Sequence, residues 1–220
     1  MLPIGDDNSQ RRLVPVVTWL LVLANVAVFF LELAGGDAFI YRWSFIPERF
    51  SQDPTGNLIT IFTSMFMHAG WLHLGGNMLY LIIFGDNVED RFGHVKFLVF
   101  YILCGVVAMV AQYIVAPVIN VPNLGASGAI AGVLGAYLVL FPRRKVRVLL
   151  WMWIVHLPAL VVIGGWILLQ LLSGIGTVGT TASATGGVAY MAHIGGFFGG
   201  VLLSYFFRNR VRALPPSYLN

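Results

Sequence analysis

The chain of 220 residues has few charged side chains and a single cysteine. Charged residues make up 10% of the sequence, against about a quarter in ordinary soluble domains. Hydrophobic residues make up 58%, far more than a soluble core needs, so the composition predicts a protein whose solvent is lipid. Cys104 has no partner for an intramolecular disulfide, and we expect it to be a small buried hydrophobe.

Other absences exclude whole classes of membrane protein. The sequence has no His-Glu-x-x-His motif, which excludes the usual arrangement of a zinc protease. No pair of aspartates lies within the apolar segments, which excludes an aspartyl dyad. A small transporter would favour an internal repeat and charges near the middle of the membrane, and neither is present. We therefore expect no metal and no cofactor.

Six apolar stretches indicate membrane-spanning helices. They are too long, and too uniformly hydrophobic, for the alternating strands of a β-barrel. They predict an all-α, polytopic membrane protein with a six-helix bundle at 14–207, between a short N-terminal tail (1–13) and a C-terminal tail (208–220). The six spans are expected at 14–34, 60–84, 95–116, 127–141, 148–172 and 189–207.

The basic residues predict how the spans are oriented. With six spans both termini lie on one side, which then carries eleven of the 13 Lys and Arg residues, whereas the other side carries Arg42 and Arg49. This bias predicts cytoplasmic termini, and we expect the plasma membrane of a prokaryote. The basic clusters are topology signals rather than a nucleic-acid surface, because no basic-aromatic recognition motif accompanies them. A signal peptide is the other interpretation of residues 11–34, but five further spans favour a retained helix. The eleven are Arg11, Arg12, Arg91, Lys96, Arg143, Arg144, Lys145, Arg147, Arg208, Arg210 and Arg212.

Polar side chains in the apolar spans are costly and are therefore functional candidates. Those of the fourth and sixth spans, and His68 in the second, fall in the first half of each span, whereas His73 and Asn77 lie just past the middle of theirs. We expect all of them to lie at a similar depth below the outer surface. Span 127–141 provides about 22 Å of helix against a hydrocarbon core of about 30 Å, which predicts a wet cavity with Ser127 at its floor. His156, in the fifth span, is expected to be interfacial. The candidates are His68, His73, Asn77, Ser127, His156 and His193.

Ser127 lies in the run Gly-Ala-Ser-Gly at 125–128. The glycines permit a sharp entry into a helix and close approach by a substrate backbone, and a helix N-terminus offers free N–H groups to an oxyanion. A helix-capping serine is the other, more common interpretation of this motif. His193 changes the balance, because glycine faces on its own span (Gly196, Gly200) and on the span of Ser127 would let the two helices approach closely. The two side chains can then meet as nucleophile and base.

The second span offers two further donors. His73 and Asn77 are four residues apart on one helix face, and both can join the Ser127 N–H in an oxyanion hole. His68 lies about 140° away from His73 around the helix, so the two histidines are not a metal pair; a structural role for His68 is as consistent with the sequence as a site role. Glu32 is the nearest carboxylate, near the outer end of the first span, so we expect a Ser–His dyad without an acid.

These residues together resemble the rhomboid proteases. The segments HAGWLHLGGN (68–77), EDRFG (89–93), GASG (125–128) and AHIGG (192–196) stand in family order, and the resemblance covers about 57–207. It implies a six-helix rhomboid core that cleaves the transmembrane segments of membrane-protein substrates near their outer end, through an acyl-enzyme. The catalytic residues implied are Ser127 and His193. Oxyanion or substrate binding is assigned to His73, Asn77, Gly125, Gly128 and His68.

Two departures from the family pattern matter. Ile59 and Thr60 stand where many members have a Trp-Arg pair, and Ala131 stands where some members have a tyrosine that stacks on the histidine. His193 therefore needs other support. Inactive relatives typically lose the serine or histidine, or place a proline before the serine, whereas Ala126 precedes Ser127 here.

Two interpretations of function remain open. The first is a serine endopeptidase, in which the fifth span and the Gly/Ser/Thr-rich loop 173–188 move to admit a substrate. The alternative is a catalytically inactive, rhomboid-like binder of transmembrane clients. Membrane lipid and transmembrane proteins are the expected partners in both.

Overall fold

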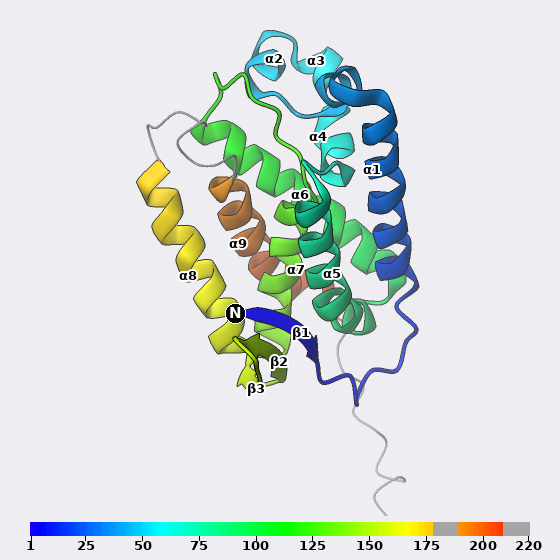
Figure 1. The fold of residues 1–220 in the computed structure, drawn as a ribbon, viewed down its shortest axis with the longest axis vertical. Coiled ribbons are helices and arrows are strands. Elements are labelled where there is room, and N and C mark those ends of the chain that lie inside the picture. The colour runs from blue at the N-terminus through cyan, green and yellow to red at the C-terminus, as the bar shows by residue number, and fades with distance from the viewer. Residues whose placement is uncertain (178–188, 209–220) are drawn as a thin grey trace, which may run out of the picture.

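The computed structural model describes residues 1–177 and 189–208, without the side chains of 176–177. Most of the loop expected at 173–188 and nearly all of the C-terminal tail expected at 208–220 lie outside this part of the chain. The longer helices pack side by side into a bundle, with short helices at one end and a small sheet at the other (Figure 1).

The longer helices follow the apolar stretches of the sequence. They are α1 (Val16–Trp43), α5 (Trp71–Phe92), α6 (His94–Val115), α7 (Ser127–Leu140), α8 (Ala159–Thr177) and α9 (Tyr190–Phe207). Shorter elements connect α1 to α5, namely α2 (Pro47–Gln52), α3 (Pro54–Asn57), α4 (Thr60–Thr63) and the 3₁₀ helix η1 (Ser64–Phe66).

Three of the described helices, α1, α6 and α9, are long and apolar enough to cross a membrane. Helices α7 and α8 are apolar but shorter, and the C-terminal half of α5 carries charged side chains. The described part of the chain is thus a helical membrane protein with several spans. That all six long helices cross the membrane stays a prediction.

Helices α1 and α5 differ from the spans expected at 14–34 and 60–84. Helix α1 continues to Trp43, across a break at Gly36 where φ is 59°. Because glycine adopts this left-handed conformation without strain, the helix resumes beyond it. The span expected at 60–84 is divided, because the backbone is extended at Met67 before α5 begins at Trp71.

The all-α expectation is wrong at one end of the bundle, where three strands form an antiparallel sheet in the order β1-β2-β3. The run Lys-Val-Arg-Val alternates between exposed and buried side chains, with Val146 and Val148 fully buried, and this period of two is that of a strand. The first residues of the span expected at 148–172 are therefore a hairpin, and His156 is exposed on its second strand. The strands are β1 (Leu2–Asp6), β2 (Lys145–Leu150) and β3 (Trp153–Pro158).

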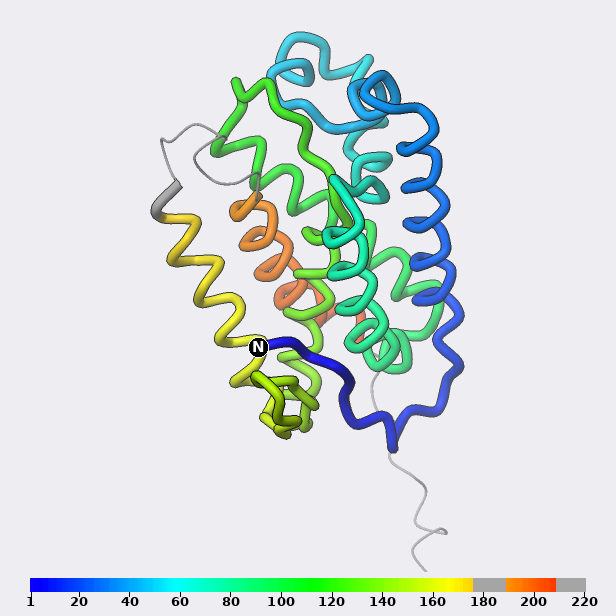
Figure 2. The backbone as a smooth tube through the Cα atoms, in the orientation of Figure 1, coloured from blue at the N-terminus to red at the C-terminus, as the bar shows by residue number. Residues whose placement is uncertain are grey.

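Strand β1 lies within the expected N-terminal tail. It pairs with β2 from Leu2 opposite Leu149 to Asp6 opposite Val146. Figure 2 shows the N-terminal segment passing from α1 beneath the bundle to the hairpin. The sheet therefore joins the first residues of the chain to the connection between α7 and α8.

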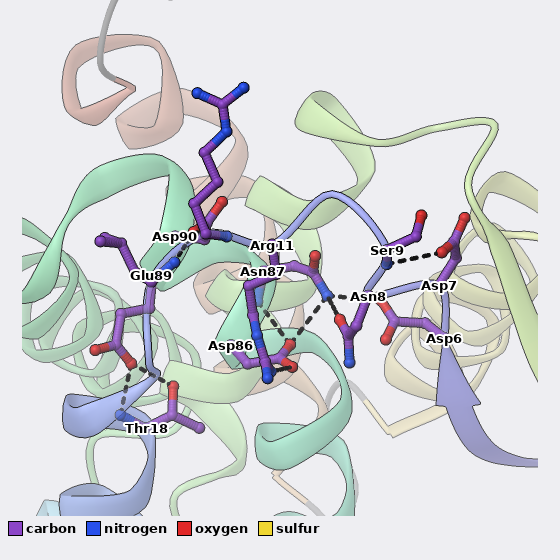
Figure 3. Close-up of polar contacts among 12 residues, drawn as sticks. Asp6, Asp7, Asn8, Ser9, Arg11, Thr18, Asp86, Asn87, Glu89 and Asp90 are labelled. Carbon is purple, nitrogen blue, oxygen red and sulfur yellow. Dashed lines mark hydrogen bonds and ion pairs between the residues drawn. The ribbon is translucent and has the colours of Figure 1, made fainter.

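A polar network secures this N-terminal segment (Figure 3). The carboxylate of Asp6 accepts hydrogen bonds from the Tyr137 hydroxyl at 2.5 Å and from the Asn87 carboxamide at 2.9 Å. Arg11 forms an ion pair of 2.5 Å with Asp86 on α5. Burial raises the pKa of Asp6 to about 6, although the hydrogen bond from Tyr137 acts in the opposite direction.

Glu89, in the EDRFG segment of α5, caps the start of α1. It is fully buried, and its carboxylate accepts hydrogen bonds from the Val17 and Thr18 N–H groups at 2.9 and 2.8 Å and from the Thr18 hydroxyl at 2.7 Å. These N–H groups have no partner within a helix, and a carboxylate also suits the positive end of the helix dipole. Glu89 thus fixes the start of α1 against the C-terminal half of α5.

Candidate active site

Helix α7 is the enclosed centre of the bundle, and each residue from Gly128 to Tyr137 is buried. It packs against α9 through glycine faces. A Cβ built on Gly196 would overlap the carbonyl oxygen of Gly128, and one on Gly200 would overlap that of Gly132. The two backbones therefore touch without side chains between them, which only small residues allow.

This backbone contact brings Ser127 and His193 together. Ser127 is the first residue of α7, and His193 lies in the first turn of α9. The His193 Nε2 and the Ser127 Oγ are 2.8 Å apart, within hydrogen-bond distance. Both residues are half-buried. A hydroxyl and an imidazole in this arrangement can act as nucleophile and general base.

Helix α6 packs against both α7 and α9 where these two helices meet. Its Ala108 lies against both Gly128 and Gly196, and Cys104 lies against Gly132. Cys104 is fully buried, as the sequence predicts. Small side chains on α6 therefore let three helices meet beside Ser127.

The segment that enters α7 requires glycine at position 125. Gly125 has a φ of 133°, and its N–H donates a hydrogen bond of 2.9 Å to the Ser64 carbonyl. A Cβ at this position would lie 2.9 Å from the Cε1 of His73 and 3.5 Å from the Oγ of Ser127. Gly125 thus meets the conformational need that the sequence predicts, and the backbone passes close to both side chains.

The second-span candidates lie on or just before α5. His73 is half-buried, and its Nδ1 accepts the Ala69 N–H at 3.3 Å, which leaves Nε2 protonated on the side of Gly125. Asn77 is buried, and its carboxamide donates to the His73 carbonyl at 3.0 Å. The structure therefore brings His73 beside Ser127, whereas the described hydrogen bond of Asn77 is to its own helix.

His68 and Glu32 form a separate polar contact next to His73. Both carboxylate oxygens of the buried Glu32 accept the His68 N–H, at 3.0 and 3.2 Å. The His68 ring is fully buried and contacts the His73 ring edge-on, with centroids 5.1 Å apart. The carboxylate thus holds the chain before α5 instead of touching His193.

Two residues beside His193 were not among the sequence candidates. The carboxamide oxygen of Gln170 lies 2.7 Å from the His193 Nδ1, and the Trp166 ring lies 5.8 Å from the imidazole, centroid to centroid. Both residues are half-buried on α8. A signal was available, because Gln170 is a carboxamide within an apolar span, where polar groups are costly.

A small cavity of about 20 Å³ lies beside Ser127. A space of this size holds about one water molecule. Within residues 1–177 and 189–208, no group of three or more His, Cys, Asp or Glu side chains is arranged to hold a metal ion. The residues that line the cavity include Met65, Gly105, Ala108, Met109, Gly128 and Ala192.

Comparisons with known proteins agree on one family. The family model of the Rhomboid domain matches residues 55–210. The chain is 29% identical to YdcA, a rhomboid protein of Bacillus subtilis, over 92% of this chain and 94% of YdcA. It is 34% identical to rhomboid protease GluP of the same organism, over 60% of this chain and 26% of GluP. Inactive rhomboid protein 1 of Drosophila melanogaster also matches, with 29% identity over 58% of this chain and 8% of that protein. The chain belongs to the rhomboid family.

Proposed function

We propose that this protein is a serine endopeptidase that cleaves transmembrane segments of membrane-protein substrates within the lipid bilayer. The observation that carries the proposal is the 2.8 Å contact between the His193 Nε2 and the Ser127 Oγ, in a member of the rhomboid family. The nucleophile and its base come from two helices whose backbones touch, so the contact is held rigidly.

The geometry supports acyl-enzyme chemistry. The Ser127 Oγ attacks the carbonyl carbon of the scissile bond while the His193 Nε2 takes its proton. The same proton then passes to the leaving amine, and the acyl group stays on Ser127. A water molecule, which gives a proton to His193, hydrolyses this ester and restores the free hydroxyl.

The oxyanion of each tetrahedral intermediate needs donors on the side of Ser127. The first N–H groups of α7 have no partner within the helix and point to its N-terminal end, where the helix dipole also favours negative charge. The His73 Nε2–H lies beside Gly125 and completes a donor pair with the Ser127 N–H. The Asn77 carboxamide uses one of its two N–H donors on the His73 carbonyl, and we assign the other N–H to the oxyanion.

We further propose that the six long helices cross a plasma membrane of prokaryotic type, with both termini in the cytoplasm. The excess of Lys and Arg residues on the side of the termini supports this orientation. Helices α5, α7 and α9 then run from outside to inside, and Ser127 lies below the outer surface. A substrate is therefore cut near the outer end of its transmembrane segment.

The test uses the full-length protein purified in detergent with a fluorogenic transmembrane peptide. We expect turnover and covalent labelling by a fluorophosphonate, and we expect both to be lost in Ser127→Ala and His193→Ala. Each variant should keep the wild-type melting temperature within a few degrees, since neither side chain forms the core. Turnover by Ser127→Ala would refute the assignment.

A second candidate is a non-catalytic binder of transmembrane clients, and the match to a relative named as inactive is the observation that favours it. This function predicts a folded wild-type protein that no fluorophosphonate labels. It also predicts that Ser127→Ala leaves the co-purification of clients unchanged. The labelling experiment therefore separates the two candidates.

A further inference from the structure

Helix α8 presents two side chains to the imidazole of His193. Gln170 and Trp166 are four residues apart and so share one helix face. The Gln170 carboxamide oxygen lies 2.7 Å from Nδ1, and the Trp166 ring is tilted by 41° against the imidazole at 5.8 Å. The imidazole is therefore held at its rim by a hydrogen bond and at its face by an aromatic ring.

The hydrogen bond to Gln170 determines which ring nitrogen is protonated. A carboxamide oxygen only accepts hydrogen bonds, so the Nδ1 of His193 carries the proton. In the neutral ring Nε2 then has a free lone pair, and it accepts the hydroxyl proton of Ser127. The other tautomer carries its proton on Nε2 and cannot act as the base.

We propose that Gln170 is a positioning residue for the base, so that the site is a Ser127–His193–Gln170 triad instead of a dyad. This inference rests on the proposed protease function. Gln170 fixes the tautomer and the orientation of the ring, and Trp166 supplies a tilted aromatic contact in place of the stacking that a tyrosine at position 131 would give. The base is then ready only while α8 is seated against α9.

The first test compares two substitutions at position 170. Methionine keeps the length of the side chain but removes the oxygen that accepts the Nδ1 proton, whereas glutamate keeps an oxygen acceptor. We expect kcat of Gln170→Met to fall about tenfold, the loss expected for one orienting hydrogen bond, with KM nearly unchanged. We expect Gln170→Glu to retain most of kcat, with the acid limb of the pH profile at higher pH, because a carboxylate stabilises the imidazolium.

A second glutamine provides a matched control. The Gln112 carboxamide on α6 accepts the N–H of Ala192, at the start of α9, at 3.3 Å. It therefore supports the helix that bears the base without touching the ring. Gln112→Met is expected to lower the melting temperature without a shift of the pH profile, whereas Gln170→Met changes kcat at little cost in stability.

The tautomer itself can be observed without turnover. In protein labelled with ¹⁵N histidine, the signals of His193 are identified by their loss in His193→Ala. We expect Nδ1 to be protonated in the wild type, and a mixture of tautomers in Gln170→Met. This measurement separates a failure of the positioning role of Gln170 from a failure of the proposed function, because it needs no substrate.

Three results are decisive. Wild-type kcat and a wild-type ¹⁵N spectrum in Gln170→Met would overturn the positioning role of Gln170 while leaving the Ser–His protease intact. A wild-type protein that neither cleaves the peptide nor reacts with the fluorophosphonate would overturn the proposed function, and with it the positioning role of Gln170. Reduced kcat in Gln170→Met with recovery in Gln170→Glu would establish Gln170 as a positioning residue.

Discussion

The contact between α7 and α9 makes a single added methyl group a strong test of the site. Gly196 faces the carbonyl group of Gly128, which follows Ser127 directly in the chain. A Cβ at position 196 would lie well inside 3.0 Å of that oxygen, closer than real Cβ atoms come. Because the obstacle is backbone, no side chain can rotate away, and the helices have to separate by about 1 Å.

The magnitude of the effect follows from this displacement. Separating the helices by about 1 Å stretches the 2.8 Å contact between His193 and Ser127 to about 3.8 Å, beyond hydrogen-bond distance. A misplacement of this size costs about 10²-fold in rate. Overpacking at such a site also destabilises by about 1–3 kcal/mol. We therefore expect Gly196→Ala to remain folded at low temperature but to lose about 99% of kcat/KM.

The assay is kcat/KM for a transmembrane peptide, measured beside the thermal melting curve in detergent. Gly164→Ala on α8 is the matched control, because a Cβ there meets nothing within 4 Å, and alanine favours a helix by about 1 kcal/mol over glycine. We expect this control to keep wild-type activity and to be at least as stable as the wild type. Wild-type activity in Gly196→Ala would refute the conclusion that backbone contact sets the geometry of the site.

Three further substitutions test other parts of the structure. Gly125→Ala forces an L side chain into a φ of 133° and against the His73 ring, so we expect fluorophosphonate labelling to slow by at least tenfold; unchanged labelling would show that the ring is not needed there. For Asp6 the folded pKa of about 6 exceeds the ordinary value of 3.8, so its stabilising contribution is complete below pH 4 and is lost as the pH rises through 6. Melting of the wild type at pH 5 and 7.5 should therefore show a loss of about 1.4 kcal/mol at the higher pH that Asp6→Asn lacks, and equal slopes for both proteins would contradict this. Glu32→Ala leaves the buried N–H of His68 without its acceptor, and we expect a loss of about 1–3 kcal/mol in thermal unfolding that Glu32→Gln largely avoids; equal melting of the two variants would remove the anchoring role.

The contact between Ser127 and His193 could be predicted from the sequence because its cause is a local pattern of glycines. Glycines at 128, 132, 196 and 200 mark one face of each helix, and close packing of these faces fixes where Ser127 and His193 lie. The helices themselves follow from apolar stretches, since lipid leaves the backbone few alternatives. The catalytic roles stay predictions until they are measured.

The sheet could not be predicted so easily, because its signal is short and lies beside a longer one. The alternation at 145–148 covers four residues and runs directly into an apolar stretch of helical length. A strand there also depends on its partner, β1, which is about 140 residues away in the sequence. Pairing over such a distance is a property of the folded chain and leaves no local pattern.

Gln170 was missed for a related reason. Its position in an apolar helix marks it as unusual, but the sequence does not say which helix it faces. The same holds for Glu32, which is recognisable as a buried acid but not as the acceptor of the His68 N–H. Such pairings depend on the rotation of one helix against another, which side-chain packing decides.

The small sheet has a consequence for the order in which the chain is assembled. Strand β1 leaves the ribosome well before its partner β2, which is translated only after four of the long helices. At 5–20 residues per second this delay lasts roughly seven to thirty seconds, during which the N-terminal segment waits at the membrane surface without its partner. Closure of the sheet, and the burial of Asp6 that accompanies it, therefore reports that the hairpin has been made and that the helices before it have been inserted.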